Sequence, residues 1–394
     1  MHSFQYYVPT EIVFGQDSLE KLPELLAKRS ISRVLVVYGG SSAKKSGLLD
    51  RVSAILFKAN VSFETLGGVQ PNPRVALARE GVRLALKFRA ELILAVGGGS
   101  VIDTCKAIAH GAANPETDIW EFWKKRAVVT KSLPVGVILT IPAAGSETSD
   151  SAVLTNAEAG EKRGLNTDFN RPSFAILDPT LAATLPSHQV ACGVSDILMH
   201  TMDRYFNPVT DNAITDEIAE ALLRVVIHHG PAAVGNPGDY AAMSEIMWCG
   251  SLSHNGLTGL GGKRDFAPHQ LGHALSEKFD VYHGDSLTAI WSSWARFVVD
   301  EDPARFARFA RNVWQVTEPD DMLAAQAGID RQESFFRLIG MPTRLTQLSC
   351  GKQDEDGLAE LASRCSYGKT RTIGTFRVLG YDQILAIYRR ANEA

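Results

Sequence analysis

The chain has 394 residues, 45% of them hydrophobic, and a net charge of −4 at pH 7. A chain of this length can bury a large core and is expected to form two domains. The sequence contains no basic run, which disfavours a nucleic-acid partner. Its longest apolar runs, such as residues 135–142, are too short to span a membrane. The N-terminus lacks a secretory pattern, and the five cysteines form no C-x-x-C pair. We therefore expect a cytoplasmic protein with reduced thiols.

The first half of the chain alternates between short apolar segments and helical patterns. Residues 6–15 have the pattern of an edge strand, a turn and a second strand. Further strands are expected at 34–38, 92–96 and 135–140, and helices at about 47–59 and 101–110. Buried strands separated by helices indicate βαβ units and a parallel sheet.

After about residue 186 the pattern becomes helical. Helices are expected at 195–205, 216–227, 241–257, 302–313, 330–339 and 357–364, with Ser195 preceding the first and Thr215 starting the second. The predicted fold class is therefore an α/β domain, residues 1–185, followed by an all-helical domain, residues 186–394. Glycine-rich loops in the first half and histidines in the second make these the expected dinucleotide-binding and metal-binding domains. The first domain has a parallel sheet with flanking helices.

A glycine-rich segment, Gly97-Gly98-Gly99-Ser100, lies between the second buried strand and its helix. Glycines let the backbone approach a ligand closely, and the helix directs its N-terminal amides to the same place, which suits a pyrophosphate. Asp103, in the first turn of that helix, is expected to cap free amides or to contact a ribose. Any tight βα turn can use glycines, so the segment alone also fits a purely structural turn.

Two more loops of small residues follow strands. Gly39-Gly40-Ser41-Ser42 follows the first buried strand, and residues 142–148 follow the third. Open parallel sheets bind ligands at the carboxyl ends of their strands, so three such loops favour a nucleotide site. The first loop lacks the acidic residue that would bind the 2′-hydroxyl of NAD, and Lys44-Lys45 follow it. This pattern favours NADP(H) over NAD(H), unless the lysines are only a solvated surface.

Carboxylate and imidazole side chains in the second half are spaced for one cation. Asp196 and His200 are four residues apart, His269 and His273 repeat that spacing, and His283 follows. Residues at i and i+4 lie on one helix face, and these ligand types suit Fe²⁺ or Zn²⁺. A single such pair is more often a surface hydrogen bond. Neither pair forms an H-E-x-x-H motif, which disfavours a zinc protease.

Together these segments resemble the iron-containing (group III) alcohol dehydrogenases, especially their butanol dehydrogenase and NADPH-dependent aldehyde reductase branch. The likeness covers essentially the whole chain, through residues 9–15, 68–73, 97–106, 140–147, 174–179 and both histidine segments. It implies a dehydroquinate synthase-like fold and a homodimer formed through the N-terminal strands.

The resemblance also implies roles for individual residues. The implied metal ligands are Asp196, His200, His269 and His283, and His273 is placed near the nicotinamide without being a ligand. The implied cofactor contacts are Gly39, Gly40, Ser41, Ser42, Asn72, Gly97, Gly98, Gly99, Ser100, Asp103, Thr140, Ser146 and Lys162. Asp150 departs from the small or amide residue that relatives often carry there, which bears on the substrate mouth.

The expected reaction transfers a hydride between NAD(P)H and a primary alcohol or aldehyde such as butanol or butanal. The metal acts as a Lewis acid on the oxygen, and His273 either relays the proton or packs beside the cofactor. Alternatives are a glycerol dehydrogenase-like polyol oxidoreductase, a dehydroquinate synthase, a non-catalytic binding protein and a metal-dependent hydrolase. A hydrolase would not need the glycine-rich loops. The aromatic residues Trp120, Phe122, Trp123 and Phe266 fit either an apolar substrate channel or the core.

Overall fold

The computed structural model describes residues 2–40, 42–209 and 211–393 and divides into two compact units. The sheet unit comprises Tyr7–Leu185 and Pro237–Ser251, and the helical unit comprises Met1–Tyr6, Pro186–Asn236 and Leu252–Ala394. The expected ranges of 1–185 and 186–394 therefore need correction at two segments. The first residues belong with the helical unit, and residues 237–251 belong with the sheet unit.

Contacts of helix α9 (Tyr240–His254) explain the second correction. The Ser251 hydroxyl donates to Glu147 at 2.6 Å, and the Thr148 hydroxyl donates to the Ser251 carbonyl at 2.9 Å. One turn earlier on α9, the Trp248 ring meets the Phe14 ring edge-on, with 6.3 Å between centroids. Helical periodicity cannot reveal such partners, because they come from segments a hundred or more residues away in the chain.

The sheet unit contains a six-stranded parallel sheet in the order β1-β8-β5-β4-β2-β3. Its strands are β1 (Glu11–Phe14), β2 (Arg33–Tyr38), β3 (Ser62–Leu66), β4 (Leu92–Gly97), β5 (Val135–Leu139) and β8 (Phe174–Leu177). A separate antiparallel pair is formed by β6 (Ser151–Asn156) and β7 (Glu161–Asn166). The central strands β4, β5 and β8 are buried at every position, as their continuous apolar sequences require when both faces are covered.

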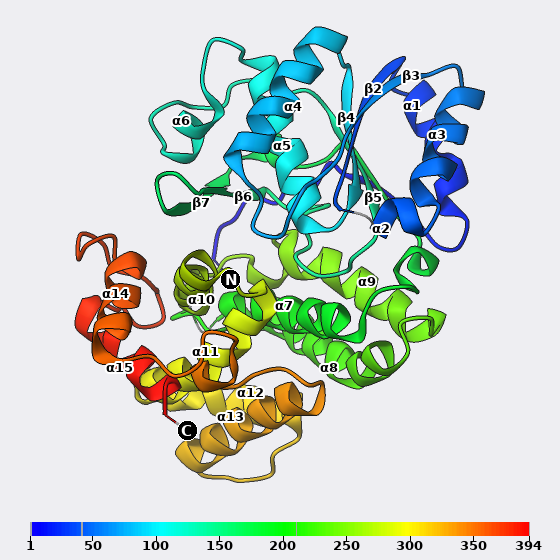
Figure 1. The fold of residues 1–394 in the computed structure, drawn as a ribbon. Coiled ribbons are helices and arrows are strands. Elements are labelled where there is room, and N and C mark those ends of the chain that lie inside the picture. Colours follow the sequence, from blue (N-terminus) through cyan, green and yellow to red (C-terminus); the bar gives the residue numbers. More distant parts are fainter. Residues whose placement is uncertain (1, 41, 210, 394) are drawn as a thin grey trace. The chain divides into compact units, whose positions relative to one another are not determined.

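Helices cover both faces of the sheet, with α4 and α5 on one side and α1 and α3 on the other (Figure 1). The helices of this unit are α1 (Leu22–Ala27), α2 (Ser42–Lys45), α3 (Leu48–Lys58), α4 (Val75–Phe88), α5 (Gly99–Ala113) and α6 (Ile119–Trp123). One core cluster joins Leu22, Leu26 and Val52 of the helices to Val34 and Leu94 of the sheet. The predicted strands and helices of this half are confirmed, with one exception.

The exception is the strand expected at the start of residues 6–15. Only Glu11–Phe14 form a strand, and residues 2–10 have no regular structure. A strand needs a neighbouring strand for its backbone hydrogen bonds. Strand β1 pairs with β8, with Glu11 opposite Phe174. Within the described residues of this single chain, the preceding segment has no such neighbour.

The helical unit contains the helices that carry the histidines. Its members are α7 (Ser187–Tyr205), α8 (Ala213–Gly235), α10 (Ala267–Phe279), α11 (His283–Val298), α12 (Pro303–Trp314), α13 (Asp321–Leu338), α14 (Glu355–Cys365) and α15 (Tyr381–Ala391). Ser195 does not precede a helix, because α7 begins eight residues earlier, at Ser187. None of the described helices is long and apolar enough to cross a bilayer.

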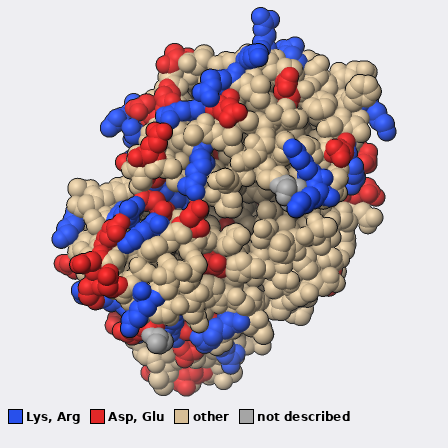
Figure 2. Space-filling view, viewed as in Figure 1, with Lys and Arg blue, Asp and Glu red and all other residues tan. Residues whose placement is uncertain are grey.

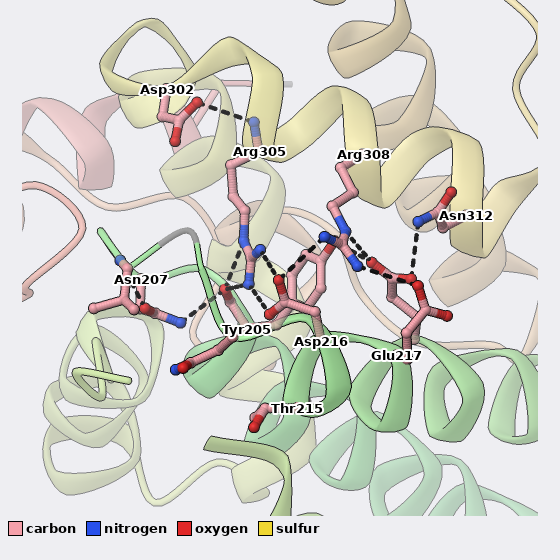
Figure 3. Close-up of polar contacts among 12 residues, drawn as sticks. Tyr205, Asn207, Thr215, Asp216, Glu217, Asp302, Arg305, Arg308 and Asn312 are labelled. Carbon is pink, nitrogen blue, oxygen red and sulfur yellow. Dashed lines mark hydrogen bonds and ion pairs between the residues drawn. The ribbon is translucent and has the colours of Figure 1, made fainter. Parts of the chain in front are cut away.

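Buried ion pairs hold α8 and α12 to the C-terminal end of α7 (Figure 3). Arg305 donates to both carboxylate oxygens of Asp216 at 2.6 Å and also to the Tyr205 carbonyl. Arg308 donates to Glu220 at 2.6 Å. Because the Arg305 and Asp216 side chains are only 3% and 4% exposed, removing one partner would leave an uncompensated buried charge. The network therefore fixes the end of the helix that also carries Asp196 and His200.

In the view of Figure 2, Lys and Arg side chains lie among Asp and Glu side chains, and a broad area at the lower right carries few charges. This distribution fits the small net charge of −4.

Candidate functional site

One carboxylate oxygen in the helical unit faces three imidazole rings. Asp196 and His200 lie one turn apart on α7, His269 lies in the first turn of α10, and His283 begins α11. The Nε2 atoms of the three histidines lie 3.3, 3.5 and 3.7 Å from Oδ1 of Asp196, in the order His200, His269 and His283. The structure thus brings together the four residues expected to bind a metal.

The buried atoms of this cluster fit a cation. The Asp196, His200 and His269 side chains are only 4–6% exposed, and one donor atom from each lies within 4.8 Å of the others. Asp196 Oδ1 and His269 Nε2 have no hydrogen-bond partner among the described residues. Leaving such atoms unsatisfied is costly, and a divalent ion would satisfy them with a ligand set that suits it. His283 stands at the margin, with a side chain 29% exposed.

Asp203 is a functional candidate that the sequence pattern did not single out. Its Oδ2 lies 2.5 Å from Nδ1 of His269, so it holds the ring with Nε2 toward Asp196. Burial lowers the pKa of His269, but the carboxylates of Asp203 and Asp196 outweigh burial and raise this pKa to about 9. Asp203 follows Asp196 by seven residues on the same helix, and this spacing is the signal that could have revealed it.

Two aromatic neighbours complete the surroundings of His200. The His254 ring lies 3.8 Å from the His200 ring, centroid to centroid, and the His269 ring stacks at 4.3 Å. Burial, followed by the influence of His254 and His269, holds the pKa of His200 well below its usual value. A neutral imidazole is the form that binds a metal. Phe266, considered as a channel or core residue, also lies beside these rings, 5.3 Å from His269.

His273 lies beside the cluster rather than at its centre. The ring is half-buried, and its centroid is 5.3 Å from that of His283 and 6.1 Å from that of His269. This position, one turn after His269 on α10, is compatible with either a proton-relay or a packing role.

The expected nucleotide loops share one edge of the sheet. Strands β5, β4 and β2 are neighbours and run parallel, so Gly97 at the end of β4 and the segments that begin with Gly39 and Thr140 lie at the same edge. The chain continues from β2 to β3 on one side and from β4 to β5 on the other, so the order reverses between β2 and β4. Open α/β sheets bind ligands at such a reversal.

The glycines at the start of α5 are required by packing as well as by ligand access. A Cβ on Gly97 would lie 2.5 Å from a Val101 methyl carbon, and one on Gly98 would lie 2.9 Å from Cβ of Ile141. No described side chain caps the N-terminus of α5, which begins at Gly99 and continues through Ser100. Its first amides are therefore available to an anion.

Asp103 does not cap these amides, so that part of the expectation is wrong. Its carboxylate instead accepts hydrogen bonds from the Ser146 hydroxyl at 2.6 Å and from the Val153 amide at 2.8 Å. Asp103 is the fifth residue of α5, so it lies beyond the first turn, and these two partners hold its carboxylate away from the first amides. It therefore joins α5 to the loop after β5.

Two other expected cofactor contacts meet each other. Nζ of Lys162 donates to Oδ1 of Asn72 at 2.8 Å, and both side chains are buried. In the first loop, Gly39 is half-buried and Gly40 is exposed. Ser41 lies outside the described residues, as does the side chain of Ser42.

Lys106 is a buried group that the sequence pattern did not identify as part of the site. Its ammonium donates to the Ser146 hydroxyl and to the Ser151 carbonyl, both at 2.7 Å. Burial lowers its pKa to about 8, although the nearby carboxylate of Asp103 opposes this shift. The sequence feature that could have revealed Lys106 is its place inside the apolar run of α5, because burying a charged side chain there without polar partners costs free energy.

The three aromatic residues that follow the Gly97 loop and were considered for a substrate channel belong to the core of the sheet unit. Trp120, Phe122 and Trp123 are 1–2% exposed, and the Trp123 indole donates to the Ala152 carbonyl at 3.1 Å. Oδ2 of Asp150 lies 4.0 Å from the Arg171 guanidinium, and Oδ1 accepts a long hydrogen bond of 3.5 Å from the Asn166 side-chain amide.

Comparison with known proteins agrees with this geometry. Residues 9–179 match the family described as iron-containing alcohol dehydrogenase, and residues 189–392 match the C-terminal part of the same family. The chain belongs to the iron-containing alcohol dehydrogenase family, so the predicted family and fold class are confirmed.

Several relatives are similar over nearly their full length. The NADH-dependent butanol dehydrogenase A of Clostridium acetobutylicum is 37% identical, with 99% of this chain and 100% of that protein covered. The NADPH-dependent aldehyde reductase YqhD of Escherichia coli is 36% identical, with 88% and 89% covered. The crystal structure of NADH-dependent butanol dehydrogenase A from Thermotoga maritima superposes with a TM-score of 0.95 at 31% identity, with 100% and 99% covered.

Proposed function

We propose that this protein transfers a hydride between NAD(P)H and a primary alcohol or aldehyde, such as butanol or butanal, with the help of one divalent metal ion. The observation that carries the proposal is the single Asp196 oxygen facing three imidazole nitrogens at 3.3–3.7 Å, in a chain of this family. The names of the relatives support the same reaction class.

In this proposal Asp196, His200, His269 and His283 hold the metal, either Fe²⁺ or Zn²⁺. When bound, the ion supplies Lewis acidity to the substrate oxygen, and the nicotinamide supplies the hydride. Asp203 positions His269 through the 2.5 Å hydrogen bond. Burial of this ligand set keeps water from competing for the carboxylate and imidazoles.

The nucleotide is held by the loops of the sheet unit. The uncapped amides at Gly99 and Ser100 bind the pyrophosphate, and Gly97 and Gly98 allow its close approach. Thr140 and Ser146 contribute from the segments after β5, while Asn72 and Lys162 act as a hydrogen-bonded pair. Asp103 and Lys106 keep the Ser146 hydroxyl in place.

His273 is proposed to pass a proton to or from the substrate oxygen. An imidazole can accept and donate protons near neutral pH, and this one lies beside His269 and His283. His273→Asn keeps a polar side chain but cannot take up a proton. We expect a lower kcat with a changed pH profile and unchanged metal content. A changed KM with an unaltered pH profile would instead indicate packing beside the cofactor.

The cofactor is proposed to be NADP(H) in preference to NAD(H). After β2 the chain continues with Gly39 and Gly40, without an acidic side chain that would repel a 2′-phosphate. Lys44 and Lys45 end the short helix α2 that follows. The relatives include both NADH-named and NADPH-named enzymes, so their names leave the preference open.

Gly39→Asp and Gly39→Asn test this preference with charge as the only difference. A Cβ at Gly39 would make ordinary contacts, 3.6 Å from the Val69 carbonyl oxygen and 3.8 Å from a Val101 methyl. Two unit charges about 5 Å apart at an effective dielectric of about 20 interact by roughly 3 kcal/mol, and exposure of the loop reduces this. We expect Asp to raise KM for NADPH about 10- to 100-fold over Asn, with little change for NADH. Equal effects on both cofactors would contradict the proposal.

The decisive experiment measures metal content and butanal reduction on the same purified sample, with NADPH and with NADH, before and after chelation. We expect activity to disappear with the metal and to return on adding Fe²⁺ or Zn²⁺. Metal and nucleotide binding without aldehyde reduction would keep the site and reject the substrate, and polyols would be tested next. A sample that binds neither metal nor nucleotide would reject the proposed function.

The oligomeric state and the cellular location are proposals as well. Tyr7 and Phe14, just before and within the edge strand β1, are 51% and 41% exposed, which supports a homodimer formed through the N-terminal segment. Light scattering of the purified protein tests this. A cytoplasmic location is supported by five free cysteines, which suit a reducing compartment.

A further inference from the structure

A second cluster of metal-binding side chains lies in the helical unit, next to the first along α7. His188 and Cys192 are separated by four residues, and Asp196 and His200 continue the same spacing. One face of α7 therefore carries two consecutive pairs of ligand-type side chains. Helix α11 contributes to both, with His283 beside the second pair and Asp285 beside the first.

The three side chains His188, Cys192 and Asp285 face one another at ligand spacing. Nε2 of His188 lies 3.2 Å from Oδ2 of Asp285 and 3.7 Å from Sγ of Cys192, and Sγ lies 3.8 Å from Oδ1 of Asp285. In a tetrahedral zinc site, the usual bond lengths place nitrogen and oxygen ligands about 3.3 Å apart and sulfur about 3.5 Å from either. The observed separations, measured to one or the other carboxylate oxygen of Asp285, are close to these values.

A catalytic triad would have a different arrangement. In a triad the imidazole uses one nitrogen for the nucleophile and the other for the carboxylate. Here the same atom, Nε2 of His188, faces both the sulfur and the carboxylate. One ligand atom from each of the three side chains lies within 4.8 Å of the others, an arrangement that suits a metal site better than a relay.

The backbone brings α7 and α11 close together at this point. A Cβ on Gly284 would lie 2.6 Å from Cα of Cys192, so the residue before Asp285 must be glycine for the helices to approach. The carboxylates of Asp285 and Asp196 also surround the thiol with negative charge and, after burial, help to raise the pKa of Cys192. The same negative charge favours a cation.

A pocket gives access to the cluster. His188 and Asp285 line a cavity of about 520 Å³ together with Tyr282, Met341 and Leu348. The His188 side chain is 45% exposed and that of Asp285 is 15% exposed. An ion can therefore reach His188 and Asp285 from solvent, and water or a small molecule in the pocket can complete its coordination.

We propose that His188, Cys192 and Asp285 form a second binding site for a thiophilic divalent cation, of which Zn²⁺ is the natural example. Binding would form metal–sulfur, metal–nitrogen and metal–oxygen bonds, and the thiol proton of Cys192 would be released to solvent. This site is separate from the Asp196 cluster, which contains no sulfur, so it does not depend on the proposed enzymatic function.

Cobalt titration of the full chain tests the proposal, because Co²⁺ bound to a thiolate gives an intense near-ultraviolet charge-transfer band. We expect the wild-type protein to show this band and to bind one more equivalent of Co²⁺ than Cys192→Ser, which should lack the band. Cys350→Ser is the matched control, since that half-buried thiol lies outside the cluster. It should keep both the band and the extra equivalent.

His188→Asn provides a second, more exposed change that is less able to disturb folding. It should weaken Co²⁺ binding at this site at least tenfold while the Asp196 cluster still takes up its metal. Absence of the band in the wild-type protein, or its persistence in Cys192→Ser, would overturn the proposal. Loss of activity alone would concern only the proposed function.

Discussion

Replacing Asp203 with asparagine tests whether this buried carboxylate positions a metal ligand. Asp203 Oδ2 lies 2.5 Å from Nδ1 of His269, and its side chain is 1% exposed. Asparagine has nearly the same shape and keeps an oxygen for the hydrogen bond, so the change removes mainly the charge. Losing the carboxylate partner of a metal-binding histidine typically weakens metal affinity about 10- to 100-fold, or about 1.4–2.7 kcal/mol.

The size of the effect should depend on pH in a defined direction. Against the lowering effect of burial, Asp203 and Asp196 raise the pKa of His269 to about 9 in the metal-free protein. At pH 7 a proton therefore competes for this imidazole, at a cost of roughly 2.7 kcal/mol for two pH units. The wild-type affinity should rise about tenfold per pH unit up to that pKa. Without the Asp203 carboxylate the pKa of His269 falls, so protons compete less in Asp203→Asn. The metal affinities of the wild-type protein and of Asp203→Asn should therefore approach each other near pH 7 and diverge at higher pH.

Zinc titration against a competing chelator, from about pH 6.5 to 8.5, measures both the affinity and its slope. His200 should add little to the slope, because its pKa lies well below the usual value. Asp330→Asn is the control, since that carboxylate is 67% exposed and pairs with Arg296. The reasoning would be refuted if Asp203→Asn matched the wild-type protein in affinity and slope across this range.

Three other predictions concern single side chains. His283→Ala should reduce metal content and activity together, and full activity with full metal content would remove it from the ligand set. Asp216→Asn leaves Arg305 buried without its counter-charge, so urea unfolding should show a loss of about 3–5 kcal/mol, and a loss below 1 kcal/mol would contradict the buried-pair account. Lys106→Met should weaken NADPH binding measured by fluorescence, because Ser146 loses a 2.7 Å hydrogen bond, whereas unchanged binding would make Lys106 purely structural.

The sequence was most informative where a residue pattern follows directly from local geometry. The runs at 92–96 and 135–140 are apolar because both faces of their strands are covered, and they form the buried strands β4 and β5. The spacing of four residues between Asp196 and His200 predicted that both lie on one face of a helix, since 3.6 residues make one turn. These features need no knowledge of distant segments.

Tertiary structure decided what depends on partners far away in the chain. The sequence predicts Asp103 in the first turn of a helix beginning near residue 101, but α5 begins at Gly99, and Ser146 and Val153 hold its carboxylate. The first expected strand is absent because residues 2–10 pair with no strand among the described residues. His254 joins the imidazole cluster only because α9 ends beside α7, and no local spacing connects it with His200.

The amino-acid sequence by itself determined the alternation of strands and helices, the glycine-rich loops and the ligand-type residues at helical spacing. Local backbone geometry is enough to define all of these. Only the tertiary structure decided that one Asp196 oxygen faces His200, His269 and His283, and that Asp285 meets His188 and Cys192. The physical reason is that metal-ligand geometry is set by the packing of α7 against α10 and α11, which are separated from it by more than sixty residues of chain.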